Sequence, residues 1–357
     1  MPINLAELFT PRAIASYWTT TASNREPIYG ASLFPAKKKA GLDLSWLKGS
    51  NGLPVSLMPS AFDAKATFRD RPGLVKTETE MPFFREGMHI GERDRQELLR
   101  VQDSKDPYAQ AVIDRLFSDA GTLLDGALVV PERMRMSLLF APSGNAGITF
   151  NANGVSYTYN YDPNSTWKTN NYTALASGYW TTPNSSDPLT DLSTLANTIA
   201  ENTGTAPGVA VMNKYTFGLM AQSAAVKARF LVTNGSTVGY LSDADVKKLV
   251  YDLLGLRVVV YNKKYKNESG TAAKFVPDGY VALLPDGPVG STWFGTTPEE
   301  ADLRSGASNA RVSIVETGIA LTQEIITHPV NVNIYASEIV LPSWERMDEC
   351  GLLKVIS

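Results

Sequence analysis

The sequence feature that most constrains the fold is a turn between two extended segments, in the stretch TFRDRPGLVKTETEM that begins at Thr67. Pro72 and Gly73 fit the second and third positions of a tight turn, because proline fixes one φ angle and glycine supplies a positive one. From Met58 up to the turn, apolar and polar side chains alternate with the period of a β-strand. The sequence therefore predicts an extended β-hairpin over residues 53–90. A two-stranded ribbon is marginal alone in water, so this one needs a surface to lie on.

The composition allows large cores and disfavours a helical bundle. The chain has 357 residues, of which 43% are hydrophobic and 19% charged. This length suffices for one large or two ordinary domains. Asn, Thr, Ser, Gly and Tyr are plentiful, which is typical of strands and of polar contact surfaces.

The charge argues against a protein whose main task is to coat nucleic acid. The formal net charge is -3 and the pI is about 5.6, whereas such binding depends on Lys and Arg neutralising phosphates. Lys37, Lys38 and Lys39 form the only basic run, and we interpret it as a solvated loop.

Cysteine usage and the first residues predict a cytosolic chain. The single cysteine, Cys350, cannot form an internal disulfide, and no basic segment followed by an apolar one opens the sequence. No run of about 18 apolar residues occurs, so we expect no membrane span.

The first half of the chain predicts an arm, a long helix and a second hairpin. Residues 1–50 show little periodicity and predict an extended arm with at most a short helix near residues 5–9. Asp106 can cap a helix over residues 106–130, and apolar residues recur there at helical spacing. The segment SLLFAPSGNAGITFNANGVSYTYNYD then predicts a hairpin around the pair Asn153–Gly154.

The second half predicts an α+β domain inserted into the first. Residues 163–187 are expected to be a loop-like bridge. After it, helices with Gly204 as a stop and with Ser242 near a helix start alternate with strands such as GVAVMN, LRVVVYN and GYVALLPDG. The strand-rich end, from Arg311 onward, is expected to return to the first sheet.

The sequence contains no strong catalytic or metal-binding motif, and we expect no cofactor. His89 and His328 each lack a second histidine or cysteine at metal-ligand spacing. The stretch GPVGST, which begins at Gly287, lacks the lysine of a phosphate-binding loop.

Two weaker patterns are also better explained without catalysis. Ser45 and Lys48 match the S-x-x-K pattern of serine acyl enzymes, but neither S-D-N nor K-T-G follows. Glu299, Glu300 and Asp302 could act as general acid and base or bind calcium, although a helix start near Pro298 explains them more simply.

Three tyrosines, Tyr157, Tyr159 and Tyr161, alternate on one face of a predicted strand. Such a row could stack sugars or bases, or it could stabilise a sheet or a subunit contact. We favour the contact.

The order of these elements resembles the major capsid proteins of tailed phages, specifically the lambda-type capsid protein E family. Three stretches carry the resemblance: PSAFDAKATFRDRPGLVKTETEMPFFREGMHIGERDRQEL, MRMSLLFAPSGNAGITFNANGVSYTYNYD and VNVNIYASEIVLPSWERMDECGLLKV. The resemblance implies an α+β chain with the Hong Kong 97-type phage capsid fold. It also implies the following parts: an N-terminal arm (1–52), an extended β-hairpin loop (53–90), a peripheral domain with a spine helix (91–187 and 306–357) and an axial domain (188–305).

The resemblance also implies a structural role without enzymatic activity. The chain would self-assemble as hexamers and pentamers into the icosahedral shell of a virion, built in the host cytoplasm around double-stranded DNA that it contacts non-specifically. Scaffolding protein, a portal and a decoration protein are the implied partners. The hairpin would lie across an adjacent subunit, and the candidate interface residues are Phe62, Phe68, Arg69, Asp70, Arg71, Phe83 and Phe84.

Three alternatives remain open from the residues alone. An encapsulin-like shell protein shares the implied fold, and a cargo-docking groove would favour it. A β-rich glycan-binding module is suggested by the Tyr and Trp content. A hydrolase would depend on Ser45 or Lys48.

Overall fold

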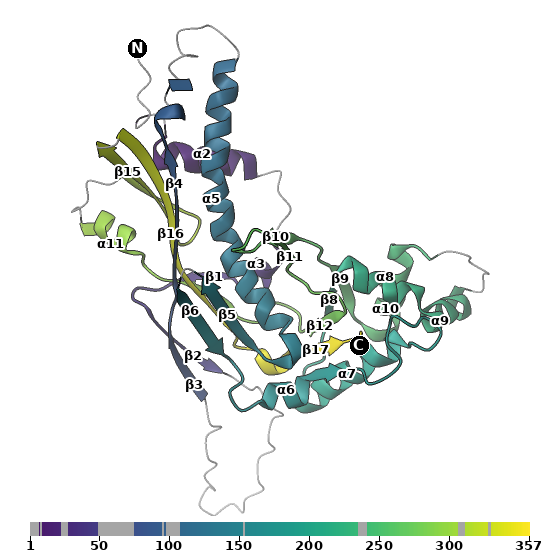
Figure 1. The fold of residues 1–357 in the computed structure, drawn as a ribbon. Helices are drawn as coiled ribbons and strands as arrows, with labels where there is room; N and C mark the ends of the chain where they lie inside the picture. Colours follow the sequence, from purple (N-terminus) through teal and green to yellow (C-terminus); the bar gives the residue numbers. More distant parts are fainter. Residues whose placement is uncertain are drawn as a thin grey trace, which may run out of the picture.

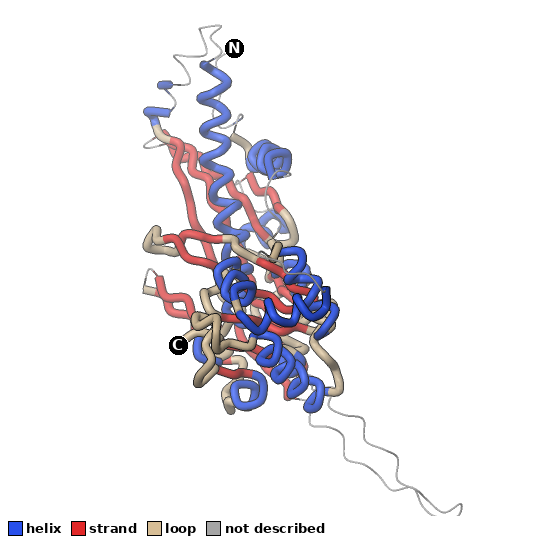
Figure 2. Tube along the Cα trace, turned by 90° about the vertical axis from the view of Figure 1, so that its right-hand side faces the viewer, coloured by secondary structure: helices blue, strands red, loops and turns tan. Residues whose placement is uncertain are grey.

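The computed structural model describes residues 7, 9–22, 28–48, 75–94, 96–97, 108–152, 154–234, 241–305, 311–327 and 330–357. Within them, two sheets organise the molecule, and one long helix runs from the first sheet towards the second (Figure 1). The side view shows the long strands of the first sheet in the upper half and the helices of the second unit gathered in the lower half (Figure 2).

The first sheet has six strands built around one long central strand. Strand β16 (Val330–Ser343) pairs antiparallel with three strands: β15, β13 and β4. Strand β1 pairs with β13, and strand β14 pairs with β15. The bounds of these five strands are β1 (Ala36–Lys38), β13 (Ser291–Phe294), β15 (Ile319–Thr327), β14 (Arg311–Val315) and β4 (Phe83–Ile90).

Helix α5 (Tyr108–Leu139) covers this sheet with an apolar stripe. The predicted stripe residues Leu116, Ala120 and Leu123 are buried and pack with side chains of β15 and β16. The helix is longer than predicted, because it continues through Pro131 and includes the SLL segment that we assigned to the following hairpin. A proline inside a helix removes one backbone hydrogen bond, and the burial of residues such as Met134 and Leu138 after it offsets that loss.

The second sheet forms the core of the other unit. Its order is β7 (Tyr172–Ala174), β17 (Gly351–Lys354), β12 (Tyr280–Leu284), β8 (Val209–Met212) and β9 (Arg257–Val260). Four helices accompany it: α7 (Pro188–Thr203), α8 (Lys214–Gln222), α9 (Ala224–Asn234) and α10 (Asp243–Leu254). Their apolar faces and the strands enclose a separate buried cluster.

The local signals in this unit are confirmed. Gly204 ends α7 with a φ of 76°, and Gly255 ends α10 with a φ of 68°, the left-handed region that favours glycine. Ser242 and Asp245 form a reciprocal capping box at the start of α10. The strands predicted in GVAVMN, LRVVVYN and GYVALLPDG are β8, β9 and β12.

Three two-stranded ribbons complete the described sheet structure. The Asn-Gly hairpin is confirmed, since β5 (Gly147–Ala152) pairs antiparallel with β6 (Val155–Asn160). Strand β10 (Lys264–Lys266) pairs with β11 (Ala272–Lys274). Strand β2 (Asp43–Lys48) pairs with β3 (Val75–Glu80).

The arm is more regular than we predicted. It contains α2 (Pro11–Ala22), a helix of 12 residues, as well as α3 (Gly30–Leu33) and strand β1. Helix α2 is held by tertiary packing, because Ile14 and Trp18 are buried against α5. The expectation of at most one short helix in the arm is therefore wrong. The prediction of a loop-like bridge over residues 163–187 is also wrong, because this segment contains α6 (Thr166–Asn171) and β7.

Two strands belong to a different sheet from the one that we expected. Strand β13, inside the segment expected to be inserted, pairs with β16 and β1 in the first sheet. Strand β17, near the end of the chain, pairs with β12 and β7 in the second sheet. The two units are therefore interlaced through both strands, which chain order alone does not reveal.

Candidate assembly surfaces

The β2–β3 ribbon is the most distinctive surface feature of the described chain. Its register runs from Asp43 opposite Glu80 to Lys48 opposite Val75, and no third described strand pairs with it. It begins at Asp43, earlier than the predicted start of the hairpin. Figure 1 shows it at the lower left of the molecule, away from the second sheet. An isolated two-stranded ribbon is marginally stable, so an assembly partner is a physical expectation here.

The root of the ribbon is fixed to its own chain. Leu44 and Met81 are buried in the core shared with α5 and β16. The backbone N–H of Met81 donates to the carbonyl of Leu42 over 2.9 Å. The hydroxyl of Tyr159 donates to the carbonyl of Glu80 over 2.9 Å. The base of the ribbon is thus anchored, and the segment between Lys48 and Val75 starts from a defined place.

Five of the predicted interface residues lie outside the described residues: Phe62, Phe68, Arg69, Asp70 and Arg71. The other two, Phe83 and Phe84, begin β4, where the chain leaves the ribbon to pair with β16. The Phe84 ring lies 5.2 Å from the Phe150 ring, and the Arg85 guanidinium lies 4.9 Å from the Phe83 ring. Both phenylalanines therefore already have intramolecular contacts, and a role against a neighbour stays a prediction.

The tyrosine row packs within the chain. Tyr157 lies 6.1 Å from Phe84 between ring centroids, and the buried Tyr161 donates its hydroxyl to the carbonyl of Pro342 over 2.5 Å. Burial raises the pKa of Tyr159 to about 12, so its hydroxyl stays a donor to Glu80 at neutral pH. These contacts join the β5–β6 hairpin to the ribbon root and the first sheet.

The arm and helix α11 (Pro298–Ser305) are tied to the first sheet by charge. Lys38 Nζ lies 2.5 Å from Glu300, while Arg85 pairs with Glu299. Lys37 lies 5.2 Å from the centroid of the Trp293 ring. Lys37 and Lys38 therefore belong to strand β1 and Lys39 follows it, so the loop prediction is wrong for the first two lysines, although Lys37 is exposed as expected. The helix start predicted at Pro298 is confirmed, with both glutamates in its first turn.

A second, buried charge cluster was missed from the sequence. Glu132 and Arg135 of α5 are buried together with Glu338 of β16. A signal was present, because Glu132 and Arg135 interrupt the apolar segment from Leu128 to Phe140. Charged residues at core positions are rare unless they are paired.

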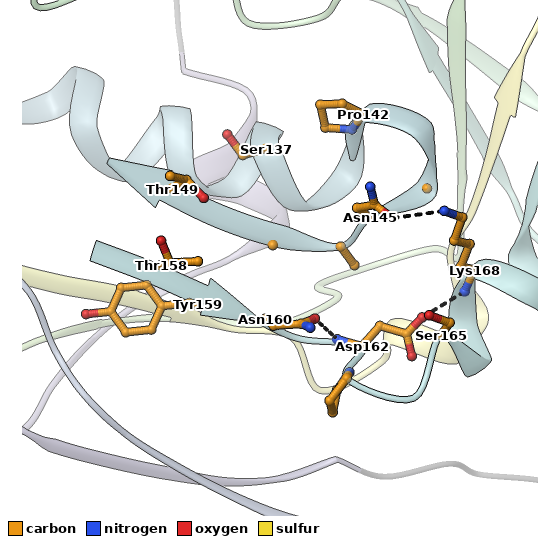
Figure 3. Close-up of a pocket in the computed structure, with 14 residues that line it drawn as sticks. Ser137, Pro142, Asn145, Thr149, Thr158, Tyr159, Asn160, Asp162, Ser165 and Lys168 are labelled. Atoms are coloured by element: carbon orange, nitrogen blue, oxygen red, sulfur yellow. Dashed lines mark hydrogen bonds between the residues drawn. The ribbon is translucent and has the colours of Figure 1, made fainter. Parts of the chain in front are cut away.

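A polar hollow lies between the C-terminal end of α5, the β5–β6 hairpin and α6 (Figure 3). Its volume is about 520 Å³. The Asp162 carboxylate accepts the backbone N–H of Lys168, and Lys168 Nζ donates to Asn145, both over 2.9 Å. Asp162, Lys168 and Asn145 are therefore paired with one another in this hollow.

The remaining chemical patterns gain no support. Ser45 lies in strand β2, so the helical-turn spacing that an S-x-x-K enzyme requires is absent. His89 is exposed on β4, and His328 lies outside the described residues. Within the described part, no three His, Cys, Asp or Glu side chains gather in a way that could hold a metal ion. No described helix has both the length and the apolar character needed to cross a membrane.

Comparison with known proteins points to one family. The family model described as phage major capsid protein E matches residues 10–354. No curated protein matches the sequence.

Solved structures of phage proteins share the fold. A protein described as a prophage capsid protein from Escherichia coli CFT073 is 13% identical, with a TM-score of 0.62 and coverage of 98% of this chain and 99% of that one. A phage-related protein from Bordetella bronchiseptica is 14% identical, with a TM-score of 0.56 and coverage of 97% and 96%. The capsid asymmetric unit of cyanophage A-1(L) contains a chain that is 12% identical, with a TM-score of 0.53 and coverage of 92% of each.

Proposed function

The chain belongs to the phage major capsid protein E family and is a capsid protein of the phage virion, and from this premise we propose how its copies join. The β2–β3 ribbon and the segment that it carries lie across an adjacent copy in the shell. Head-to-tail contacts of this kind close into rings when the rotation between copies allows it. The rings are the hexamers and pentamers of an icosahedral shell.

The observation that carries the proposal is the ribbon itself. It is anchored at its root by Leu44 and Met81 but pairs with no third described strand. Residues 49–74 join its two strands. If this segment doubles back on itself, it can span at most roughly 45 Å, because an extended residue covers about 3.4 Å. That reach is comparable with the diameter of a domain, so it suffices to contact a neighbour.

The proposed contacts on the neighbour are apolar and ionic. Phe62 and Phe68 would be covered by the adjacent copy, since each large apolar side chain that leaves water contributes about 1.5–3 kcal/mol. Arg69, Asp70 and Arg71 would form ion pairs at the far end, which are individually weak. Many modest interfaces, repeated around a closed shell, provide the strength of the container.

The further partners belong to the same proposal. The interior of the shell holds double-stranded DNA without specific contacts, and the mild net negative charge of -3 suits a wall along which DNA must slide. Scaffolding protein, a portal and a decoration protein are proposed partners. We assign no enzymatic step to the chain, because the family to which it belongs is one of major capsid proteins.

Electron microscopy of the purified full-length chain tests this function. We expect closed particles or rings of copies to form as the protein concentration is raised. A chain that stays monomeric at every concentration, alone and in an extract containing the other head proteins, would contradict the proposal.

A further inference from the structure

A buried carboxylate on α5 joins three separate parts of the chain. Glu132 has no exposed surface. It accepts the backbone N–H of Gly30 over 3.0 Å and the hydroxyl of Tyr261 over 2.9 Å. It also accepts Arg135 Nη1 over 3.3 Å. Gly30 belongs to the arm, and Tyr261 follows strand β9 of the second sheet. One side chain therefore links the arm, helix α5 (the spine helix) and the unit built on the second sheet (the second unit).

Arg135 extends this junction to the first sheet. Its Nε donates to Thr292 Oγ1 of β13 over 2.9 Å, and the Thr292 hydroxyl donates to the carbonyl of Phe34 in the arm over 3.0 Å. Burial lowers the pKa of Arg135, although the neighbouring Glu132 opposes that shift. An arginine rarely loses its proton, so Arg135 supplies one positive charge to the junction.

Glu338 of β16 is the third buried charged residue of the junction, and it lacks the hydrogen bonds of the others. It is 1% exposed, and neither carboxyl oxygen has a hydrogen-bond partner among the described residues. The charge that acts on it is that of Arg135. Phe84 lies opposite it on β4, and Glu86, two residues along that strand, is exposed.

One arginine cannot balance two buried carboxylates. Three donors converge on Glu132, so both of its carboxylate oxygens have hydrogen-bond partners. No donor reaches Glu338, and burial raises its pKa well above the ordinary value while Arg135 only partly opposes this. The protonated form therefore belongs to Glu338, because a buried carboxylate without donors is strongly disfavoured.

We propose that Glu132, Arg135 and Glu338 form an alkali-sensitive latch that holds the arm, the spine helix and the second unit in one arrangement. While Glu338 is neutral, Glu132 and Arg135 form a balanced pair. When Glu338 ionises, it adds a second negative charge beside a single arginine. The arrangement that buries it then loses stability, and the contacts of Gly30 and Tyr261 open more often.

The direction of the pH dependence follows from linkage. A carboxyl whose pKa is raised in the folded state stabilises that state most at low pH, below its ordinary value. This stability is lost as pH rises from the ordinary value towards the raised one. In that interval, the equilibrium constant for opening rises by up to about tenfold per pH unit for one proton released. The latch is thus tightest in mild acid and weakens towards alkaline pH.

Hydrogen exchange of the Gly30 amide tests the latch in the full-length chain. Wild type is compared with Glu338→Gln at each pH between about 6 and 8, so that the intrinsic pH dependence of exchange cancels. We expect the ratio of the opening constants, wild type over variant, to rise with pH. Glu201→Gln, a change at an exposed helix position, should leave the wild-type profile unchanged. A ratio that stays constant across this interval would overturn the proposal.

A second measurement needs only the wild-type protein. Infrared difference spectra should show the carbonyl band of a protonated carboxylic acid in the folded chain at neutral pH. The band should disappear as pH rises. Its absence at neutral pH would also overturn the proposal, even if the Gln variant did not fold.

Discussion

At the scale of single residues, the junction under the spine helix leaves no room at Gly30. A Cβ added there would overlap Glu132 Oε2 and lie 3.0 Å from Arg135 Cδ. The glycine is required by this close approach, because the neighbouring carboxylate has no exposed volume into which it could move. Gly126, in the same helix as Glu132, has no atom within 4 Å of an added Cβ. The two glycines therefore provide a matched pair.

We expect Gly30→Ala to lower the free energy of unfolding by about 1–3 kcal/mol, the cost of disrupting a buried hydrogen bond. Gly126→Ala should raise it by up to about 1 kcal/mol, because alanine is the better helix former in an open position. Urea denaturation of both variants gives the two values. Equal effects of the same sign would show that Gly30 is not packed against Glu132 as described.

At the scale of elements, the role of the β2–β3 ribbon can be tested by a shortened variant. Lys48 and Val75 face each other in the register, so a two-residue Asn-Gly turn can join them in place of residues 49–74. We expect this shortened chain to fold with an unchanged thermal unfolding midpoint, because the buried root residues Leu44 and Met81 are kept. We also expect it to form no shells, measured by light scattering and electron microscopy.

A length-matched control separates the effect of the connecting backbone from that of the side chains of residues 49–74. Replacing residues 49–74 with a Gly/Ser linker of the same length keeps the connection but removes every side chain proposed to contact a neighbour. This variant should also fail to assemble. Shells of normal size from either variant would show that the segment is dispensable.

The sequence predicted those elements whose signals are local. The capping box of Ser242 and Asp245, the stop at Gly204 and the Asn-Gly hairpin depend on neighbours in the chain, and all are confirmed. Strand partners depend on distant residues. The exchange of β13 and β17 between the two sheets, and the pairing of β2 with β3, therefore could not be predicted from local patterns.

The sequence pointed to the ribbon but not to the buried junction. The turn predicted at Pro72 and Gly73, which lie outside the described residues, pointed to this part of the chain, and the described ribbon begins at Asp43, before the predicted start at residue 53. The buried junction was not predicted, because the partners of Glu132 come from Gly30 and Tyr261, which are separated from it by 102 and 129 positions. Only the tertiary fold brings these groups together.

At the scale of the whole molecule, a body with its own cores carries a ribbon that needs a partner. The two sheets and α5 contain three buried apolar clusters, so the body has the cores expected of an independently folded chain. The ribbon, beyond its root, has no described strand partner of its own. We propose that another copy of the chain in the shell is that partner.

A cryo-electron microscopy reconstruction of the assembled particle tests this claim most directly. We expect residues 49–74 of each copy to contact the body of an adjacent copy, which covers Phe62 and Phe68. A reconstruction in which this segment contacts only its own chain would contradict it.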